Sequence, residues 1–316
     1  MRKLKAIFMG NPEFSLPVLK QLHKMPEIQL SLVCGGIDKK VGRGQKLKSP
    51  PTIEYAKLND IPYLQCENIN KSEDFAELIE KEKVDLIIVF AFSHFLGSRI
   101  LNFPEIGCFN IHTSLLPKYR GSSPIHYALL NGDQETGVCV QKMVKKMDAG
   151  SILHEEKIII NEDDDYETLC SKFHAILPDF TKTFLEKISL GDLSYKQQNE
   201  DLVTFAPLIK KTEGLLDANN DDYNGIKNKL RAFKVWPGVF IYINSLRYKI
   251  LEVIESNEII NTGEIKIKEK RLFVGLRSSS MEILQIQPPG KRALSAREFI
   301  NGTNQKEPLI ITEQEG

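Results

Sequence analysis

The sequence lacks the features that mark membrane-spanning and secreted proteins. Its 316 residues contain no apolar run that approaches the roughly 20 residues needed to cross a bilayer. The basic N-terminus precedes an apolar stretch, Leu4 to Met9, that is shorter than a signal-peptide core and is followed by no small-residue cleavage site. The five cysteines are scattered and form no CxxC pair, so neither a disulfide framework nor a zinc ribbon is indicated. We therefore expect a protein of the reducing cytoplasm without a membrane partner.

Net charge and nucleotide-binding signatures are also missing. The 42 Lys and Arg residues balance 42 Asp and Glu residues, which argues against nucleic-acid binding by a bulk positive field. The turn "MGNPEFS" at residues 9–15 holds a single Gly, so a dinucleotide or P-loop site is not expected there. The six histidines show no HxH or HExxH pattern, and no metal is expected. One local basic cluster remains, "KKVGRGQKLK" at residues 39–48, which is either a solvated face or a nucleic-acid contact.

Short apolar runs alternate with helical patterns through the first part of the chain. Strands broken by helices indicate βαβ units and a buried, mainly parallel, Rossmann-like sheet. The predicted strands cover residues 4–9, 30–35, 84–92, 107–112 and 137–144, and the predicted helices cover residues 15–25, 72–83 and 164–188.

The second part of the chain has a different pattern. Residues 191–206 are polar and lack periodicity, so they are predicted to link a catalytic domain at residues 1–190 to a second domain at residues 207–316. Short alternating strands in the second domain indicate a small OB-like β-barrel. The predicted fold class is therefore α/β with a mainly parallel sheet, followed by this barrel.

One stretch, "NIHTSLLPKYRGSSPI" at residues 110–125, concentrates chemistry at a predicted strand end. Asn110 and His112 are two positions apart, so a strand turns both side chains to one face. An amide can donate to a developing oxyanion, and an imidazole can take or relay a proton near neutral pH. The pair suits acyl transfer through a tetrahedral intermediate, although a lone histidine at a strand end is more often structural.

An acid follows in the loop "MDAGSIL" at residues 147–153. If Asp148 reaches the histidine it would hold the ring in one tautomer and favour the imidazolium; otherwise it is a turn residue. Ser114 to Pro117, "SLLP", offers backbone groups and an apolar wall to a flat ligand, or simply closes the core. No metal is needed for such a site.

These residues together resemble the folate-dependent formyltransferases, whose pattern is Asn-x-His-x-Ser-Leu-Leu-Pro, then Arg-Gly and Pro-Ile, with a distal Asp-x-Gly loop. Within that family the resemblance to the branch that formylates an aminoacyl-tRNA extends over nearly the whole chain. "GRGQKLKSPP" at residues 42–51 resembles a basic loop of that branch, and "LQIQPPGKRALSAREFINGT" at residues 284–303 resembles part of its C-terminal barrel.

The resemblance implies an enzyme that transfers a formyl group from 10-formyltetrahydrofolate to the α-amino group of methionine on initiator tRNA, for translation initiation. It implies that Asn110, His112 and Asp148 are catalytic. It also implies folate binding by Ser114, Leu115, Leu116 and Pro117, and tRNA binding by Arg43, Lys46, Lys48, Lys210, Lys211, Lys291 and Arg292. Ser93 and His94 stand at pocket-wall positions where the family has Gly and an aliphatic residue. A monomer is expected.

Two other functions are compatible with parts of the sequence. A formyltransferase that acts on an amino-sugar nucleotide would share the catalytic trio and the folate turn, but the basic cluster at residues 39–48 would be out of place beside a small sugar. A non-catalytic RNA-binding protein could keep the barrel alone, but it would have no use for an intact Asn110, His112 and Asp148.

Overall fold

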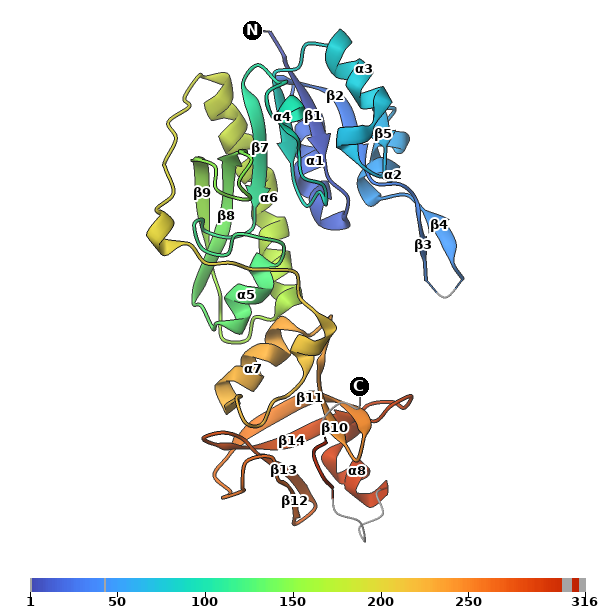
Figure 1. The fold of residues 1–316 in the computed structure, drawn as a ribbon, viewed down its shortest axis with the longest axis vertical. Helices are drawn as coiled ribbons and strands as arrows, with labels where there is room; N and C mark the ends of the chain where they lie inside the picture. The colour runs from blue at the N-terminus through green and yellow to red at the C-terminus, as the bar shows by residue number, and fades with distance from the viewer. Residues whose placement is uncertain (1, 43, 303–308, 313–316) are drawn as a thin grey trace. The chain divides into compact units, whose positions relative to one another are not determined.

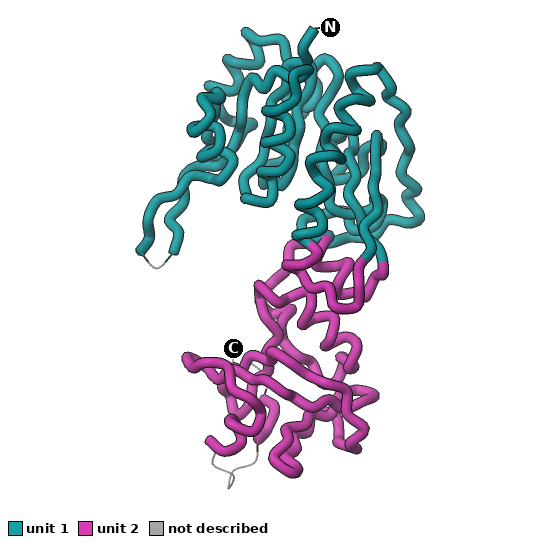
Figure 2. The backbone as a smooth tube through the Cα atoms, turned by 180° about the vertical axis from the view of Figure 1, so that it is seen from behind, with its two compact units in different colours: residues 1–124, 135–159, 170–206 teal, residues 125–134, 160–169, 207–316 magenta. Residues whose placement is uncertain are grey.

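The computed structural model describes residues 2–42, 44–302 and 309–312, and its elements are labelled in Figure 1. Arg43, one of the residues predicted to bind tRNA, lies outside the described residues. Two compact units divide the chain (Figure 2): unit 1 comprises residues 1–124, 135–159 and 170–206, and unit 2 comprises residues 125–134, 160–169 and 207–316. The domain boundaries expected from the sequence stay a prediction.

Unit 1 is built on a seven-stranded sheet with the order β5-β2-β1-β6-β7-β8-β9. The first five of these strands run parallel, and β8 and β9 add an antiparallel edge. The strands are β1 (Leu4–Met9), β2 (Ile28–Gly35), β5 (Tyr63–Gln65), β6 (Leu86–Val89), β7 (Gly107–His112), β8 (Glu135–Lys142) and β9 (Ile152–Ile159). The expected α/β fold with a mainly parallel sheet is therefore confirmed.

The central strands form because nearly every side chain on them is apolar and buried. All four residues of β6 are buried, as are the last four of β1, which is the pattern of strands covered on both faces. Helices α1 and α2 both pack against β2. The helices of this part of the chain are α1 (Leu16–Lys24), α2 (Pro51–Leu58), α3 (Glu73–Lys81), α4 (Ser98–Leu101), α5 (Pro124–Leu130) and α6 (Tyr166–Ser189).

A basic β-hairpin extends from unit 1. Its strands β3 (Lys39–Val41) and β4 (Lys46–Lys48) pair antiparallel with each other, and neither belongs to the main sheet. All six residues of the two strands are exposed, and Figure 1 shows the hairpin projecting from the rest of the unit. The residues of the basic cluster that lie on these two strands are thus presented to solvent.

Unit 2 is dominated by an antiparallel sheet with the order β10-β11-β14-β13-β12, to which β15 adds by pairing with β14. Buried side chains of this sheet include Ile250 on β11 and Ile283 and Ile286 on β14. This second domain agrees with the expected small barrel-like domain. Its elements are α7 (Tyr223–Ala232), β10 (Val239–Ile243), β11 (Leu246–Ser256), β12 (Ile265–Lys268), β13 (Arg271–Gly275), β14 (Ser280–Gln287), β15 (Leu294–Ser295) and α8 (Ala296–Gly302). Four short 3-10 turns complete the described elements: η1 (Glu13–Ser15), η2 (Ile69–Lys71), η3 (Glu200–Leu202) and η4 (Lys211–Gly214).

Candidate active site

Strand β7 places Asn110 and His112 at its carboxyl end, where ligands of parallel sheets bind. Both side chains turn toward the carboxylate of Asp148, which comes from the loop between β8 and β9. Asn110 Nδ2 lies 3.4 Å from Asp148 Oδ1, and His112 Nδ1 lies 3.9 Å from Asp148 Oδ2. The structure therefore brings the three predicted catalytic residues together.

The Asp148 carboxylate is held by several donors. Gln141 Nε2 donates to Oδ1 at 2.9 Å, and the backbone N–H of Gly121 donates to Oδ2 at 2.9 Å. The backbone of Asp148 is in the left-handed region, with φ of 48°, a conformation that an L-residue adopts only where its surroundings impose it. This carboxylate is thus fixed in place beside the histidine ring.

The His112 ring is buried and anchored from its other side. Its Nε2 lies 2.8 Å from the backbone carbonyl of Tyr119, and since a carbonyl only accepts, Nε2 carries the hydrogen. The ring nitrogen that faces Asp148 is therefore Nδ1. The Tyr119 carbonyl thus fixes the tautomer, and the Asp148 carboxylate faces the other ring nitrogen.

Gln141 was not found by the sequence analysis. It lies on β8 directly opposite Asn110 in the strand register and is only 2% exposed. Its amide donates to Asp148 and accepts from the backbone N–H of Gly150 at 2.9 Å, so it contacts the Asp148 loop at two positions. The available signal was a glutamine inside an otherwise apolar strand run, "GVCVQK", since a buried polar side chain needs a partner.

A thiol also lies next to the trio but is unsuited to act as a nucleophile. Cys139 pairs with His112 across β7 and β8 and is fully buried. Burial raises the pKa of the Cys139 thiol to about 12, so the thiol stays protonated at neutral pH. Covalent catalysis through this cysteine is therefore not supported.

Arg120, the first residue of the Arg-Gly pair, is buried and is held by Gln198 and Glu200. Arg120 is 1% exposed, and its guanidinium donates to Gln198 Oε1 and, at 2.7 Å, to Glu200 Oε1. Lys146 Nζ reaches the second oxygen of Glu200 at 2.5 Å. Hydrogen bonds from Arg120 and Lys146 lower the pKa of Glu200 to about 2. A buried guanidinium is stable only when its charge and its donors are matched, as they are here.

We expect Glu200→Gln to destabilise the protein at neutral pH and to become harmless in acid. The folded-state pKa of Glu200 is lowered from 4.5 to about 2, so its contribution to stability is present above about pH 4.5 and is lost as the pH falls toward 2. Thermal unfolding of both proteins between pH 7 and pH 2 measures this. The difference in Tm between the wild type and Glu200→Gln should be largest above pH 5 and should disappear near pH 2.

The matched control for that experiment is Glu77→Gln in α3. Glu77 pairs with Lys81 at 3.0 Å, but both side chains are more than two-thirds exposed, and such surface pairs contribute little. This variant should differ little from the wild type across the pH range. A Glu200→Gln variant that behaves like the control would show that Arg120 does not depend on the carboxylate.

The turn predicted to bind folate, Ser114 to Pro117, is packed into unit 1. Ser114 is fully buried and its hydroxyl donates to the Lys118 carbonyl at 2.6 Å, while Leu116 packs with Cys139 and Ile152. The carbonyl of Leu115 accepts from the backbone N–H of Lys118. These contacts give the turn a fixed shape, and its role in folate binding stays a prediction.

His94, at the predicted pocket wall, lies against the ring of Phe92 with the centroids 4.8 Å apart. Its Nδ1 is buried without a hydrogen-bond partner in the described part of the chain. Burial, helped by Lys39 in β3, lowers the pKa of this histidine. His94 is therefore neutral at physiological pH, with a ring nitrogen left to bond a ligand.

Two of the predicted tRNA-binding residues of unit 1 lie on β4, and the third, Arg43, lies outside the described residues. Lys46 and Lys48 are exposed, and Lys48 Nζ is 4.0 Å from Glu54 Oε2. Those of unit 2 occupy two places, both exposed: Lys210 and Lys211 precede α7, and Lys291 and Arg292 follow β14. The Arg292 guanidinium is paired with Glu298 at 2.8 Å. The role of these residues in tRNA binding stays a prediction.

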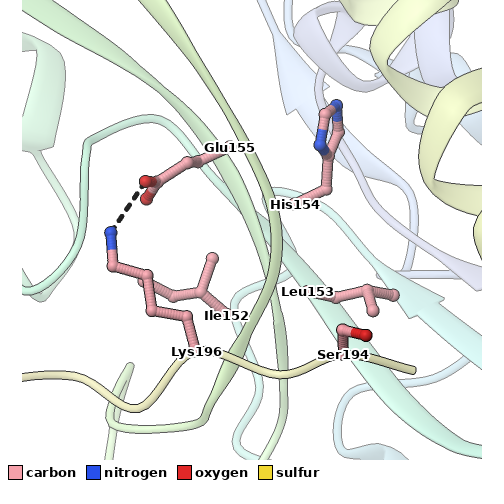
Figure 3. A pocket seen from close by; sticks show the side chains of 6 residues that line it. All are labelled: Ile152, Leu153, His154, Glu155, Ser194 and Lys196. Atoms are coloured by element: carbon pink, nitrogen blue, oxygen red, sulfur yellow. Dashed lines mark hydrogen bonds and ion pairs between the residues drawn. The ribbon is translucent and has the colours of Figure 1, made fainter. Parts of the chain in front are cut away.

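One pocket of about 210 Å³ lies beside β9 and contains none of the trio (Figure 3). Its wall includes Lys196, whose Nζ donates to Glu155 Oε1 at 2.8 Å, as the dashed line in Figure 3 shows. The full lining is Ile152, Leu153, His154, Glu155, Ser194 and Lys196. This pocket is therefore separate from the contacts around Asp148.

Metal-binding clusters and membrane-spanning helices are both absent from the described residues. No group of three or more His, Cys, Asp or Glu side chains in that part of the chain is arranged to hold a metal ion. No helix among the same residues is long and apolar enough to cross a membrane.

Comparison with known proteins defines the class of this molecule. The formyl transferase model matches residues 3–180, and the model of the formyl transferase C-terminal domain matches residues 208–304. The fold is therefore that of a two-domain formyl transferase.

Individual relatives narrow this class. The chain is 35% identical to methionyl-tRNA formyltransferase of Geobacter metallireducens over 96% of both chains. It is 37% identical to methionyl-tRNA formyltransferase of Lactobacillus acidophilus, covering 95% of this chain and 96% of that protein. The chain belongs to the methionyl-tRNA formyltransferase family.

Solved structures agree on the fold. An N-formyltransferase from Helicobacter canadensis, in complex with folinic acid and dTDP-3-aminofucose, superposes with a TM-score of 0.65 at 19% identity, covering 90% of this chain and 99% of that one. At this identity the likeness shows the fold alone.

Proposed function

We propose that Asn110, His112 and Asp148 carry out the transfer of a formyl group from 10-formyltetrahydrofolate to the α-amino group of methionyl initiator tRNA. The observation that carries this proposal is the meeting of the Asn110 amide and His112 Nδ1 at one fixed carboxylate, at the carboxyl edge of the sheet. The two substrates are inferred from the family to which the chain belongs. The trio provides the amide, the imidazole and the carboxylate that such a transfer needs.

The reaction follows from the properties of these groups. The amine nitrogen attacks the formyl carbon, which forms a carbon–nitrogen bond and places negative charge on the formyl oxygen. Donors aimed at that oxygen lower the barrier, and the Asn110 amide and a protonated His112 Nδ1 are such donors. The proton lost by the amine passes to the leaving nitrogen of the folate, whose bond to carbon then breaks. The products are formyl-methionyl-tRNA and tetrahydrofolate.

Asp148 supports the charge that develops on His112. With Nε2 committed to the Tyr119 carbonyl, protonation at Nδ1 makes a cation that faces Asp148 Oδ2 at 3.9 Å. A carboxylate held by Gln141 and the Gly121 backbone cannot turn away from that cation. This is the charge-supporting role that an acid plays beside a histidine in acyl-transfer sites.

The folate and acceptor sides are assigned to different segments. We assign the folate to the turn from Ser114 to Pro117, with neutral His94 on the pocket wall. We assign the acceptor stem to the hairpin of β3 and β4, including Arg43, and phosphate contacts to the basic residues of unit 2. The five cysteines are free, which suits the reducing cytoplasm in which we place the reaction.

An acceptor assay tests the proposed function directly. The protein is incubated with 10-formyltetrahydrofolate and either methionyl initiator tRNA or an amino-sugar nucleotide, and release of tetrahydrofolate is measured. We expect release with the charged tRNA and none with the sugar nucleotide. Release with the sugar nucleotide alone would replace the tRNA assignment, and release with neither would favour a non-catalytic RNA-binding protein.

We expect the double variant Lys46→Ala, Lys48→Ala to weaken tRNA binding in a salt-dependent way. Each phosphate neutralised by a protein cation contributes about 0.7–0.9 to the slope of log K against log salt concentration. The slope should therefore flatten by one to two units if both lysines meet phosphate, while the KM for formyl-folate stays nearly constant. Filter binding of methionyl initiator tRNA across a salt series measures the slope.

The control removes the same charge elsewhere in unit 1. Lys24 and Lys83 are exposed and lie outside the hairpin, so Lys24→Ala, Lys83→Ala should leave the slope within experimental error of the wild type. Equal slopes for the two double variants would contradict the assignment of the hairpin to tRNA.

A further inference from the structure

Residues 196–206, which are part of the predicted linker at residues 191–206, run across the active-site loops of unit 1. At one end Lys196 and Ile152 exchange two backbone hydrogen bonds of 2.8 Å. At the other end the Arg120 N–H donates to the Thr204 carbonyl at 2.9 Å, and the Ala206 N–H donates to the Arg120 carbonyl at 2.8 Å. We call this segment the strap; it begins after α6 in Figure 1.

Between its two ends the strap grips the backbone of the Asp148 loop through Gln198. Gln198 Nε2 donates to the carbonyl of Asp148 at 2.8 Å and to the carbonyl of Gly150 at 2.7 Å. Its Oε1 accepts from Arg120 Nε at 3.0 Å and from a second Arg120 nitrogen at 2.8 Å. Both donor hydrogens and the acceptor of this amide are therefore used, and every partner lies on a segment of the active site.

The strap also reaches His112, through Tyr119. The Tyr119 N–H donates to Thr204 Oγ1 at 2.9 Å, while the carbonyl of the same residue holds His112 Nε2. Tyr119 is in the left-handed region with φ of 63°, as Asp148 is with φ of 48°. The backbone of Tyr119, which holds His112, and the backbone of Asp148 are thus both strained. Each is hydrogen-bonded to a side chain of the strap.

We propose that the strap positions the catalytic pair, with Gln198 as the positioning residue for Asp148 and Thr204 as the positioning residue for His112. This inference rests on the proposed function of the trio. A displacement of about 1 Å in a catalytic group can cost on the order of 100-fold in rate, so a loop that relaxes by this amount slows turnover without loss of the fold. The strap contacts backbone groups behind the reacting atoms, so substrate affinity depends on it less than turnover does.

Gln198→Ala removes the grip on the Asp148 loop while sparing the carboxylate itself. We expect kcat to fall about 10- to 100-fold, with the KM for formyl-folate and for methionyl initiator tRNA within about twofold of wild type. Gln198→Glu keeps the acceptor for Arg120 but sets a carboxylate against two carbonyls, and it should be at least as slow. The control is Gln29→Ala, since Gln29 is an exposed glutamine of β2 outside the strap; its kcat should stay within twofold.

A double-mutant cycle with Asp148→Asn separates a positioning role from a general one. If Gln198 acts through Asp148, the variant that carries both changes should be no slower than Asp148→Asn alone by more than about twofold. If the kcat losses of the two single variants multiply in the double variant, Gln198 acts elsewhere and the proposal is overturned. A Gln198→Ala enzyme with the kcat of the wild type would overturn it as well. Thr204→Val should lower kcat and Thr204→Ser should restore it, because the hydroxyl accepts the hydrogen bond from the Tyr119 N–H; equal rates for the two would refute the part of the strap that serves His112.

The same cycle distinguishes failure of this inference from failure of the proposed function. An Asp148→Asn enzyme with undiminished kcat would remove the catalytic trio itself. A slow Asp148→Asn enzyme beside an unaffected Gln198→Ala enzyme would leave the trio in place and remove only the strap. Measuring Tm for each variant identifies any loss of rate that comes from unfolding.

Discussion

His112→Ala is expected to lower kcat by about 100-fold or more, with a smaller change in the KM for formyl-folate. The variant loses the ring that the Tyr119 carbonyl orients and that faces Asp148, and with it both a proton carrier and a donor to the developing oxyanion. Asn110→Ala should have a similar effect because it removes the second donor. Initial rates of methionyl-tRNA formylation at saturating folate measure both variants.

A matched histidine variant controls for the loss of an imidazole in general. His23 is exposed and bonds the hydroxyl of Tyr55 at 3.0 Å, away from β7. His23→Ala should keep the kcat of the wild type. If His112→Ala and Asn110→Ala also turned over at the rate of the wild type, the assignment of the trio would be wrong, and the strap proposal that depends on it would fail with it.

The fold was predictable where strands are buried on both faces. Residues 4–9 and 107–112 were predicted as strands and are β1 and β7 without a shift of either end. The strand predicted at residues 84–92 is shorter, since β6 covers only Leu86–Val89. The chain leaves the sheet there because Ala91 has a φ of 51° and the Phe90 carbonyl accepts from the Ser15 hydroxyl. Hydrophobicity alone continues past that point and cannot mark the end.

The active site was predictable only as far as local spacing reaches. The period of two along a strand placed Asn110 and His112 on one face, and a distal acid could be proposed as their partner. The contacts that hold this acid come from far along the chain: Gln198 is 50 positions from Asp148, and its place in a polar, aperiodic segment suggested only a linker. Such long-range polar contacts leave no periodic pattern in a single sequence. Gln141 is intermediate, since the pairing of β7 with β8 sets it beside Asn110.

At the Gly of the Arg-Gly pair, the strap lies close to the backbone that donates to Asp148. Gly121 has a φ of 127°, a conformation open almost only to glycine, and a Cβ there would lie 2.5 Å from the Ala206 carbonyl oxygen on the strap. Its N–H donates to Asp148 Oδ2 at 2.9 Å. A side chain at this position must therefore displace either the strap or the donor that fixes the carboxylate.

We expect Gly121→Ala to lower both stability and turnover. Backbone strain and the clash with Ala206 together should reduce the free energy of unfolding by about 2–4 kcal/mol. The shift of the N–H away from Asp148 should lower kcat at least about 10-fold in the protein that remains folded. Urea unfolding gives the first quantity, and formylation rates below the unfolding transition give the second. Gly302→Ala is the control, because a Cβ there meets no atom within 4 Å; should Gly121→Ala match it in both measurements, the close approach of the strap to the segment that holds Asp148 would be contradicted.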